Sequence, residues 1–439
     1  MNVALIKTKA EQALTEQFET ARATLPGGEA VAELRAAALG RFAAAGLPHR
    51  RIEEWKYTDL RSSIKDALQP AAPAAAVGAK DVDAALGGLA AIDATRVVFV
   101  NGRHDAALST RQSDGLEIGS LGAALKEAPA KVASALMQTG AELDALPLVA
   151  LNAAYVTDGA ILRIASKARL SKPVLLVFLD AGGAARTTTR NVISIGAGAE
   201  ATVVEVHAKL AGAADGQANT LTQTVVGDAA NVAHLKVTRA GNSATHLATW
   251  ITRLGKDSVY RAFQATSGSG LVRNETFATF DGEGAKLDIS GVFLARGREH
   301  IDTTLTVDHA VPGCESRELF KGVLADRGRG IFQGKVIVRP DAQKTDGKQM
   351  AQALMLSEDA EFDSKPELEI YADDVICGHG STSAEIDADL LFYMRARGIP
   401  TEEARALLIE SFVGEALDKI EHEGLRKALM AEARSWLAS

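Results

Sequence analysis

The sequence predicts a mainly β protein whose centre is a parallel β-helix, a solenoid, flanked by α-helical segments at its N-terminal and C-terminal ends. Strand-like runs rich in Val, Thr, Ile and Leu follow one another from about residue 196 to 372 with almost no helical interruption. Glycines recur among these runs at a regular spacing, and stretches with helical periodicity lie on both sides of them. Many runs alternate between apolar and polar residues, as strands do.

The glycine spacing indicates one strand and one turn per interval. Successive glycines lie 13 to 16 residues apart, which accommodates a strand of about five to eight residues and a turn. A β-sandwich normally closes after about seven to nine strands, whereas a solenoid continues because each coil buries its apolar face against its neighbours. We therefore predict a parallel β-helix with two such units per coil, and a double β-sandwich is the alternative. The glycines are Gly196, Gly212, Gly227, Gly241, Gly255, Gly268, Gly282, Gly297, Gly313 and Gly328.

Composition along the chain divides it into three predicted domains. They are an N-terminal helical domain over residues 1–92, a β-helix core over 93–385 and a C-terminal helical domain over 386–439. Helices are expected where Ala, Glu, Leu and Arg are frequent, and an Ala- and Pro-rich stretch at 69–78 indicates a linker. The expected helical segments are Glu11–Ala23, Ala30–Ala45, Thr58–Leu68 and Leu121–Leu146, and early strands are expected at Val97–Val100, Ile161–Ile164, Val174–Leu179 and Val192–Ile195.

The C-terminal region returns to helical periodicity. A helix over Asp389–Arg397 is expected to stop at Gly398, which suits the position after a C-cap. Thr401 is expected to cap the next helix, because acidic residues follow it in the first turn, and Gly424 to end it before a last helix over Leu425–Leu437. The apolar stripe of the longer helix could cap the solenoid or dock a partner, and the pattern leaves both open. The stripe consists of Ala404, Leu408, Phe412, Ala416 and Ile420.

Composition also limits the partners and the compartment. The 439 residues carry a formal net charge of −8, so we expect no nucleic acid partner, because phosphate-backbone binding needs a concentrated basic face. Apolar runs are shorter than the ~20 residues of a membrane span, and no secretory signal is apparent, so we expect a cytoplasmic protein with no membrane partner. The two cysteines, Cys314 and Cys377, are too few for a disulfide framework or for a Cys₄ metal site within this chain.

The sequence carries no motif of a self-sufficient enzyme. A P-loop, a G-x-S-x-G elbow and an H-E-x-x-H motif are all absent, so we expect neither ATP hydrolysis nor another catalytic activity from this chain alone. Acidic pairs at Asp373–Asp374 and at Asp387 with Asp389 leave one alternative, a stand-alone β-helix enzyme that acts on carbohydrate through paired carboxylates. Two observations disfavour it: adjacent strand residues point to opposite faces, and aromatic residues, which stack on sugars, make up only 5% of the chain.

Cys377-Gly378-His379 is the strongest candidate for a metal site. On a strand, Cys377 and His379 share a face within ~7 Å of each other, and thiolate and imidazole are ligands that iron, zinc and copper accept. Two ligands hold a metal weakly, so a complete site would need ligands from another chain. The alternative is that Cys377 is a small buried hydrophobic residue and His379 a hydrogen-bonded strand residue.

A set of segments, dense from about residue 300 to 415 and sparse elsewhere, carries a family resemblance. They are Gly46–Pro48, Glu54–Thr58, His300–Thr303, Cys314 with Ser316–Arg317, Lys344–Gly347, Lys365–Val375, Cys377–Thr382, Phe392–Tyr393 and Arg395–Ile399. Together they resemble the SufB/SufD family of iron–sulfur cluster assembly proteins, and its SufD branch in particular. The resemblance implies a right-handed parallel β-helix between an N-terminal and a small C-terminal helical domain.

The resemblance also implies a role and partners. It implies a non-catalytic scaffold subunit of the SUF complex, with a SufB-type paralogue and a SufC-type ATPase as partners. The ATPase would dock on the C-terminal helices, at Leu408 and Phe412. The paralogue would pair near the C-terminal end of the β-helix, where Cys377 and His379 would bind iron or a nascent cluster shared with that partner, and no cofactor would be held permanently.

One departure from SufB concerns the turn Ser357–Ala360. SufB carries a cluster-building cysteine in this turn, whereas Ala360 cannot ligate a metal, so the resemblance implies a supporting share of the site. The residues leave open whether the working form is a heterodimer or a homodimer, which cluster is made, and whether a flavin takes part.

Overall fold

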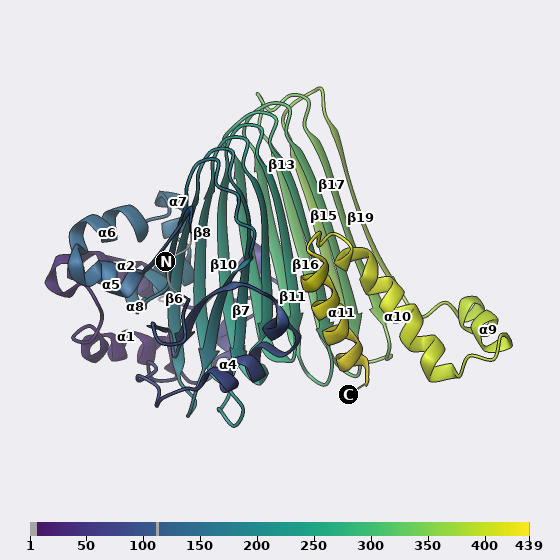
Figure 1. Cartoon of the computed structure of the whole chain (residues 1–439), viewed down its shortest axis with the longest axis horizontal. Coiled ribbons are helices and arrows are strands. Elements are labelled where there is room, and N and C mark those ends of the chain that lie inside the picture. Colours follow the sequence, from purple (N-terminus) through teal and green to yellow (C-terminus); the bar gives the residue numbers. More distant parts are fainter. Residues whose placement is uncertain (1–6, 111–113, 439) are drawn as a thin grey trace, which may run out of the picture.

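The chain forms two long β-sheets that face each other, with helices packed on their outer surfaces (Figure 1). The computed structural model describes residues 7–110 and 114–438. From β4 onwards, even-numbered strands enter one sheet and odd-numbered strands the other, and each strand pairs in parallel with the strand two places along the chain. This arrangement is a parallel β-helix with two strands per coil, as predicted, and the parallel pairing contradicts the double-sandwich alternative.

Both sheets are described by their strands in spatial order. The ten-stranded sheet contains β19 (Ile376–Ala384), β17 (Asp346–Met355), β15 (Glu315–Leu324), β13 (Lys286–Ala295), β11 (Val259–Ser267), β9 (Asn231–Arg239), β7 (Glu200–Lys209), β5 (Val174–Asp180), β1 (Thr95–Val100) and β2 (Arg103–Asp105). The nine-stranded sheet contains β18 (Glu361–Ile370), β16 (Arg329–Val338), β14 (His300–His309), β12 (Ser269–Phe280), β10 (Gly241–Leu254), β8 (Gln217–Val226), β6 (Arg186–Ile195), β4 (Ala160–Ile164) and β3 (Leu116–Ser120). The antiparallel strands β2 and β3 form the outermost strands at the N-terminal end.

Nine of the ten evenly spaced glycines lie in the turns between consecutive strands, which confirms their interpretation as turn residues, and Gly241 is the first residue of strand β10. Two physical reasons select glycine there. Gly212 has a φ of +78°, a conformation that other residues rarely adopt. At Gly282 a Cβ atom would lie 2.0 Å from the backbone nitrogen of Lys256, so only a residue without a side chain lets neighbouring turns stack.

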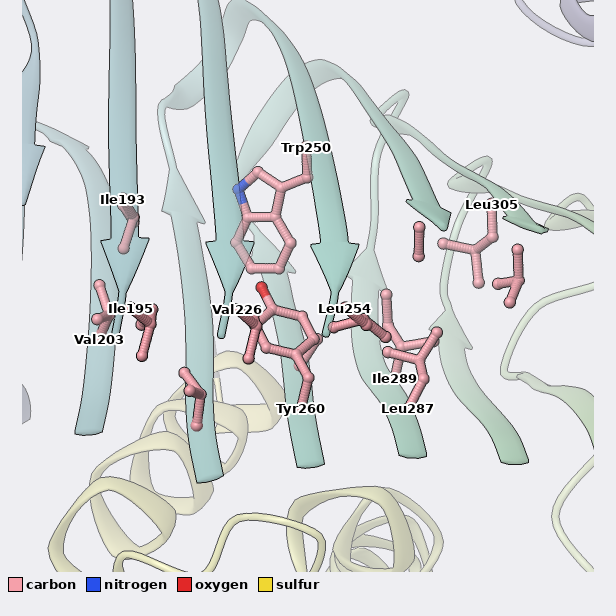
Figure 2. Close-up of a cluster of buried hydrophobic side chains, with 14 of the residues drawn as sticks. Ile193, Ile195, Val203, Val226, Trp250, Leu254, Tyr260, Leu287, Ile289 and Leu305 are labelled. Carbon is pink, nitrogen blue, oxygen red and sulfur yellow. The ribbon is translucent and has the colours of Figure 1, made fainter. Parts of the chain in front are cut away.

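One part of the interior between the sheets is apolar (Figure 2). Ile195, Val226 and Leu254 stand in register on three neighbouring strands of one sheet. Tyr260 and Leu287 do the same on the facing sheet. Burying an aliphatic side chain contributes about 1.5–3 kcal/mol, so these ladders stabilise each coil against the next.

Another part of the interior is polar and centred on Glu205 of β7. Its carboxylate accepts hydrogen bonds from His207 Nε2 at 3.3 Å and from His234 Nε2 at 2.9 Å. His234 Nδ1 in turn lies 2.7 Å from the hydroxyl of Tyr260, which donates to it. Burial alone would raise the pKa of Glu205, but the hydrogen bonds from the two histidines outweigh burial and hold the pKa well below its usual range.

Lys236 supplies a positive charge to this interior. It follows Glu205 in register on the neighbouring strand β9. Its Nζ donates to Asn274 Oδ1 at 2.6 Å across the interior and lies 5.4 Å from the centroid of the Trp250 ring. Burial lowers the pKa of Lys236 to about 8, although the charge of Glu205 opposes that shift. Glu205 and Lys236 are therefore charges enclosed in the same protein interior.

Helices from two separate stretches of sequence, residues 9–63 and 121–155, cover the outer face of the nine-stranded sheet. The rings of Phe18 and Tyr155 pack edge to face at 5.5 Å between the centroids, and Leu247 and Leu271 of the sheet belong to the same apolar core. The helical elements before β4 are α1 (Lys9–Ala21), η1 (Gly28–Val31), α2 (Ala32–Ala45), η2 (Glu53–Trp55), α3 (Leu60–Ser63), α4 (Ala79–Leu86), η3 (Gly87–Ala91), α5 (Leu121–Glu127), α6 (Pro129–Leu136), α7 (Ala141–Asp144) and α8 (Pro147–Tyr155).

The helix predicted over Thr58–Leu68 is wrong for most of its length. Only the single turn α3 forms, because the hydroxyls of Ser62 and Ser63 bond back to the carbonyl oxygen of Asp59 and the backbone becomes extended at Ile64. The following segment then runs beside the β-helix, where Ala71 N and Arg186 O are 2.9 Å apart. Pairing with strand β6 begins at Gln69, directly after the predicted helix.

The signature around Glu54 lies across the outer face of the nine-stranded sheet. The backbone oxygen of Glu54 accepts hydrogen bonds from Arg273 Nη2 on β12 (2.8 Å) and from Gln333 Nε2 on β16 (3.2 Å). The guanidinium of Arg273 stacks on the Trp55 ring at 3.8 Å from its centroid. Thr58 donates to Asp302 on β14. This short segment therefore ties the helical layer to several coils at once.

Three helices follow the last strand: α9 (Ala388–Ala396), α10 (Thr401–Leu417) and α11 (Glu423–Ala438). In Figure 1, α10 and α11 lie on the ten-stranded sheet, and α9 projects beyond it. Thr401 is the first helical residue and makes no capping hydrogen bond, so its prediction as N-cap is wrong: Pro400 holds that position. Gly424 lies in the first turn of α11 and does not end α10. No helix in the described parts of the chain is long and apolar enough to cross a membrane.

Candidate functional site

The C-terminal end of the β-helix presents two free strand edges. Of the described strands, β18 pairs only with β16, and β19 pairs only with β17. Three apolar side chains are largely exposed on this last coil, Ile370 (42%), Tyr371 (61%) and Ile376 (66%). Unpaired backbone groups beside exposed apolar side chains are a template for pairing with another chain.

Cys377 and His379 share the interior face of β19 at this open end. Their register partners on β17 are Gly347 and Gln349. A Cβ atom added at Gly347 would lie 3.6 Å from both Cys377 Sγ and Val336 of the opposite sheet, which fixes the face as the interior one. Cys377 is half-buried and His379 is exposed. The thiol and the imidazole are therefore on one side and open to a partner.

The electrostatic surroundings keep the Cys377 thiol protonated at neutral pH. Burial raises the pKa of Cys377, the backbone N–H of Gly347 partly offsets this, and the charge of Asp346 adds to the rise. Thiolate is the form that ligates metals, so metal binding here must release a proton. Across residues 7–110 and 114–438, no three His, Cys, Asp or Glu side chains converge to hold a metal. The donor set fits half of a site that another chain completes.

A groove of about 470 Å³ runs along the outer face of β19. Gly378 has no side chain to fill the groove, and open space surrounds the position of its Cβ. The side chain of Met350 lies next to Gly380. Gly378 does not interrupt the strand, whose pairing with β17 is continuous. A partner segment placed here meets a positively charged rim. The basic residues of the groove are Arg317, Lys348 and Lys419.

The turn Ser357–Ala360 forms a corner between β17 and β18. Ala360 packs against the interior core, and the hydroxyl of Ser357 accepts a hydrogen bond from the backbone N–H of Asp326 at 2.8 Å. Both residues thus have structural contacts, and neither supplies a thiolate. The two acidic pairs also have structural contacts: Asp374 forms an ion pair with Lys344, and Asp387 caps the N-terminus of α9.

The C-terminal helices expose more apolar surface than the predicted stripe. Phe412 is half-buried, with Lys321 Nζ at 4.4 Å from its ring centroid, and Leu408 is half-buried beside it on α10. By contrast, Phe392 (71%) and Tyr393 (54%) on α9 and Leu407 (42%) on α10 are largely exposed. Among its described side chains α9 buries none. We call the set Phe392, Tyr393, Leu407 and Leu408 the α9–α10 surface.

The α9–α10 surface contains residues that the stripe analysis missed. A signal for them was present in the sequence: residues 390–394 are five consecutive apolar residues at the start of a short helix. Consecutive residues of a helix point in different directions, so one contact face cannot bury all five. Such a run indicates apolar residues that remain exposed unless a second surface covers them.

Comparisons with known proteins identify a family over most of the chain. The family described as "SUF system FeS cluster assembly, SufBD core domain" matches residues 178–412, and "SufBD protein N-terminal region" matches residues 8–176. The iron-sulfur cluster assembly protein SufD of Escherichia coli (strain K12) is 31% identical over 391 residues, which cover 88% of each chain. A SufBD family protein of Synechocystis is 31% identical over 85% of this chain and 84% of its own length. SufD of Bacillus subtilis is 28% identical over 67% of this chain and 68% of its own length.

The chain therefore belongs to the SufBD family of iron–sulfur cluster assembly proteins. Its similarity to the SufD proteins of two bacteria places it on the SufD branch of that family.

Proposed function

We propose that this chain is a non-catalytic, cytoplasmic scaffold subunit that pairs with a SufB-type paralogue, docks a SufC-type ATPase and helps to bind iron or a nascent cluster. The observation that carries the proposal is the pair Cys377 and His379, side by side at an end of the β-helix that has two free strand edges. The SufD names of its relatives support the same role.

Pairing with the paralogue uses the edges of β18 and β19. An added strand from another chain satisfies backbone groups that the last coil leaves unpaired, and pockets for its side chains supply specificity. A subunit of the same family offers similar edges, so a heterodimer brings two such ends together. The same edges could also pair two copies of this chain when the paralogue is absent.

Iron, or an iron–sulfur cluster, is the cargo of this site. Cys377 and His379 provide one soft and one intermediate ligand, and the paralogue must provide the others. Because the pKa of Cys377 is raised, a metal competes with a proton for the sulfur, so affinity increases as pH rises toward that pKa.

Loss of either ligand should weaken metal binding by about 100-fold, at the upper end of the ~10–100-fold that even an outer-shell change costs. We expect this for Cys377→Ser and for His379→Ala in the complex with the paralogue, titrated anaerobically with Fe²⁺ or with Co²⁺ as a spectroscopic probe. Affinity of the wild type should rise by up to ~10-fold per pH unit between pH 6 and 8, because one thiol proton is released.

Cys314→Ser is the matched control for the metal titration. Cys314 is the other cysteine, fully buried directly before β15 with its sulfur 3.5 Å from the backbone oxygen of Gly282. Its replacement should leave metal affinity unchanged. Equal affinity in wild type, Cys377→Ser and His379→Ala would remove the support for this half-site.

Docking of the ATPase is proposed on the α9–α10 surface, with Leu408 and Phe412 at its inner border. We expect Phe392→Ser to weaken binding of the ATPase by roughly 30-fold or more, as loss of an aromatic anchor does at interfaces. Because Phe392 is 71% exposed, the melting temperature should not change. Binding is measured by calorimetry between the purified ATPase and the full chain.

Val225→Ser is the control for docking, since Val225 is an apolar residue of comparable exposure (53%) on β8. Phe412→Ser is less suitable, because Phe412 packs on Lys321, which also pairs with Glu415 of α10, and its loss should loosen the helix itself. If Phe392→Ser and Val225→Ser bind the ATPase equally well, docking occurs elsewhere.

A further inference from the structure

A column of polar side chains lies directly behind His379 in the interior of the β-helix. Glu318 on β15 pairs in register with Gln349 on β17, and Gln349 pairs with His379 on β19. Neighbouring strands are ~4.8 Å apart, and residues paired in register point to the same side. Each side chain of the column therefore lies next to the following one.

Gln349 has one hydrogen-bonding atom in use and one without a partner. Its Nε2 donates to Glu318 Oε2. The carboxyl oxygen accepts this hydrogen bond, so the contact orients the amide with its nitrogen toward Glu318. The remaining atom, Gln349 Oε1, is buried and has no hydrogen-bond partner among the described residues. It is an acceptor next to His379, in a position where buried polar atoms normally have a donor.

Gly334 on the opposite sheet provides the space that Gln349 occupies. A Cβ atom at Gly334 would lie 2.1 Å from Gln349 Nε2 and 2.6 Å from its Cδ. Any side chain at this position would displace the amide. The amide group of Gln349 is thus confined by the carboxylate of Glu318 and by the bare backbone of Gly334.

A histidine that binds a metal through one ring nitrogen almost always donates the other N–H to a carbonyl or carboxylate, which fixes its tautomer and orientation. Within the described parts of the chain, the His379 ring has no hydrogen-bond partner. We propose that Gln349 is the positioning residue of His379: its Oε1 accepts the ring N–H that faces the interior, while the other ring nitrogen faces the metal. Glu318 and Gly334 act through Gln349.

This inference rests on the proposed function of Cys377 and His379, and it assigns roles to three residues that a list of ligands would leave out. It also gives a reason for a glutamine beneath an exposed histidine. Without an oriented acceptor, the imidazole has two tautomers and free rotation, and both reduce the population that is ready to bind metal.

The test measures Co²⁺ affinity of the complex with the paralogue. We expect Gln349→Leu and Gly334→Ala each to weaken binding by ~10–100-fold, as loss of an outer-shell partner does. Gly334→Ala is informative because it displaces the amide of Gln349 while Gln349 and His379 both remain in the chain. In Gln349→Leu the buried Glu318 loses its donor, but burial already raises the pKa of Glu318 to about 7, so it can become neutral and the fold should persist.

A rescue separates positioning from packing. Exchanging the two residues, Glu318→Gln with Gln349→Glu, keeps a donor–acceptor pair in the column and leaves a carboxylate oxygen for His379, so affinity should return to within a few-fold of wild type. The matched control is Gln352→Leu, a glutamine on the same strand that is 3.4 Å from Thr382 of β19 on the outer face. It should bind Co²⁺ like the wild type.

A second readout needs no metal. Selective ¹⁵N labelling of histidine reports the tautomer of His379, whose signal is identified by its loss in His379→Ala. Wild type should show one dominant tautomer and Gln349→Leu a mixture. If Gln349→Leu and Gly334→Ala keep wild-type affinity and tautomer while His379→Ala loses binding, the positioning role is refuted and the proposed function stands. If His379→Ala binds as well as wild type, the proposed function itself fails.

Discussion

Replacing Arg273 by leucine is expected to lower the free energy of unfolding by about 3–5 kcal/mol, the range for breaking a buried ion pair from one side. Arg273 is fully buried on the outer face of β12. Its Nη1 lies 2.5 Å from Asp302 Oδ2, and its Nη2 lies 3.1 Å from Glu275 Oε1. Leucine leaves both carboxylates buried without their cation, and burial already raises the pKa of Glu275.

Arg273 also organises the segment that joins the helical layer to the β-helix. Its guanidinium stacks on Trp55 and donates to the backbone oxygen of Glu54, so leucine removes a cation–π contact and a hydrogen bond together. The expected result is an early, local release of the Glu54–Thr58 signature. Urea denaturation followed in parallel by tryptophan fluorescence and far-ultraviolet circular dichroism should detect it.

Arg253→Leu is the matched control for this prediction. Arg253 lies on the neighbouring strand β10 and pairs with Asp281 at 2.6 Å, but both side chains are substantially exposed. Exposed pairs contribute about 0–1 kcal/mol, so this variant should unfold nearly as wild type does. Adding Asp302→Leu to Arg273→Leu should recover part of the lost free energy of unfolding, since it removes a buried carboxylate that has no cation beside it. A loss for Arg273→Leu no larger than that for Arg253→Leu would contradict the role assigned to this cluster.

The architecture was predictable because local backbone geometry selects the glycines at its turns. A turn that needs a positive φ, as at Gly212, or a backbone with no room for a side chain, as at Gly282, selects glycine whatever the rest of the chain does. Repetition of that local requirement at strand-length intervals is sufficient to predict the coil. The helix expected from Thr58 failed because the hydroxyls of Ser62 and Ser63 bond back to the carbonyl oxygen of Asp59 and the backbone becomes extended at Ile64, so a weak helical preference did not extend beyond one turn.

The polar interior was not predictable, because alternation defines two faces of a strand but not which face is inside. In the run 202–207, Glu205 and His207 alternate with Val204 and Val206. The valines face outward, where helix α4 packs on β7 and belongs to the same apolar cluster, and the charged and polar residues face inward. That choice depends on which helices return to cover the sheet, and a sequence pattern within one strand contains no information about it.

The candidate site, too, was predictable only in part. Period-two geometry predicts that Cys377 and His379 share a face, but only the stacking of the coils places that face in the interior, above Gln349. On α10, strict four-residue steps drift by about 40° each around a helix of 3.6 residues per turn. The buried face therefore moves from Ala404 to Ile409 and Val413, and leaves Leu408 and Phe412 at its border.

The second large effect is expected at Glu205, whose replacement by glutamine removes the anion from the enclosed polar interior. We expect the free energy of unfolding to fall by about 3–5 kcal/mol at pH 7, because Glu205 is the charge that acts on buried Lys236 among the described residues, and its loss leaves that cation uncompensated. His207 and His234 also lose a charged acceptor. The variant is compared with wild type by urea denaturation over a range of pH.

The pH dependence of this loss has a definite sign. Burial depresses the pKa of Lys236 to about 8, below the value of about 10.5 in an unfolded chain, so the cost of enclosing its charge is present in full below pH 8 and is relieved as pH rises. Removing Glu205 takes away the charge that opposes this depression, and the pKa of Lys236 must fall further. The deficit of Glu205→Gln relative to wild type should therefore be largest near pH 6 and shrink toward pH 9.

A double variant identifies Lys236 as the source of the loss. Glu205→Gln combined with Lys236→Met removes both charges, and it should be more stable at pH 7 than Glu205→Gln alone, because an enclosed pair can be replaced by neutral groups at little cost whereas half of a pair cannot. Its stability should also lose the part of the pH dependence between 6 and 9 that Lys236 contributes. A deficit that is the same at both ends of that range, or a double variant no better than the single one, would mean that Glu205 stabilises the fold through its histidine hydrogen bonds and not through its charge.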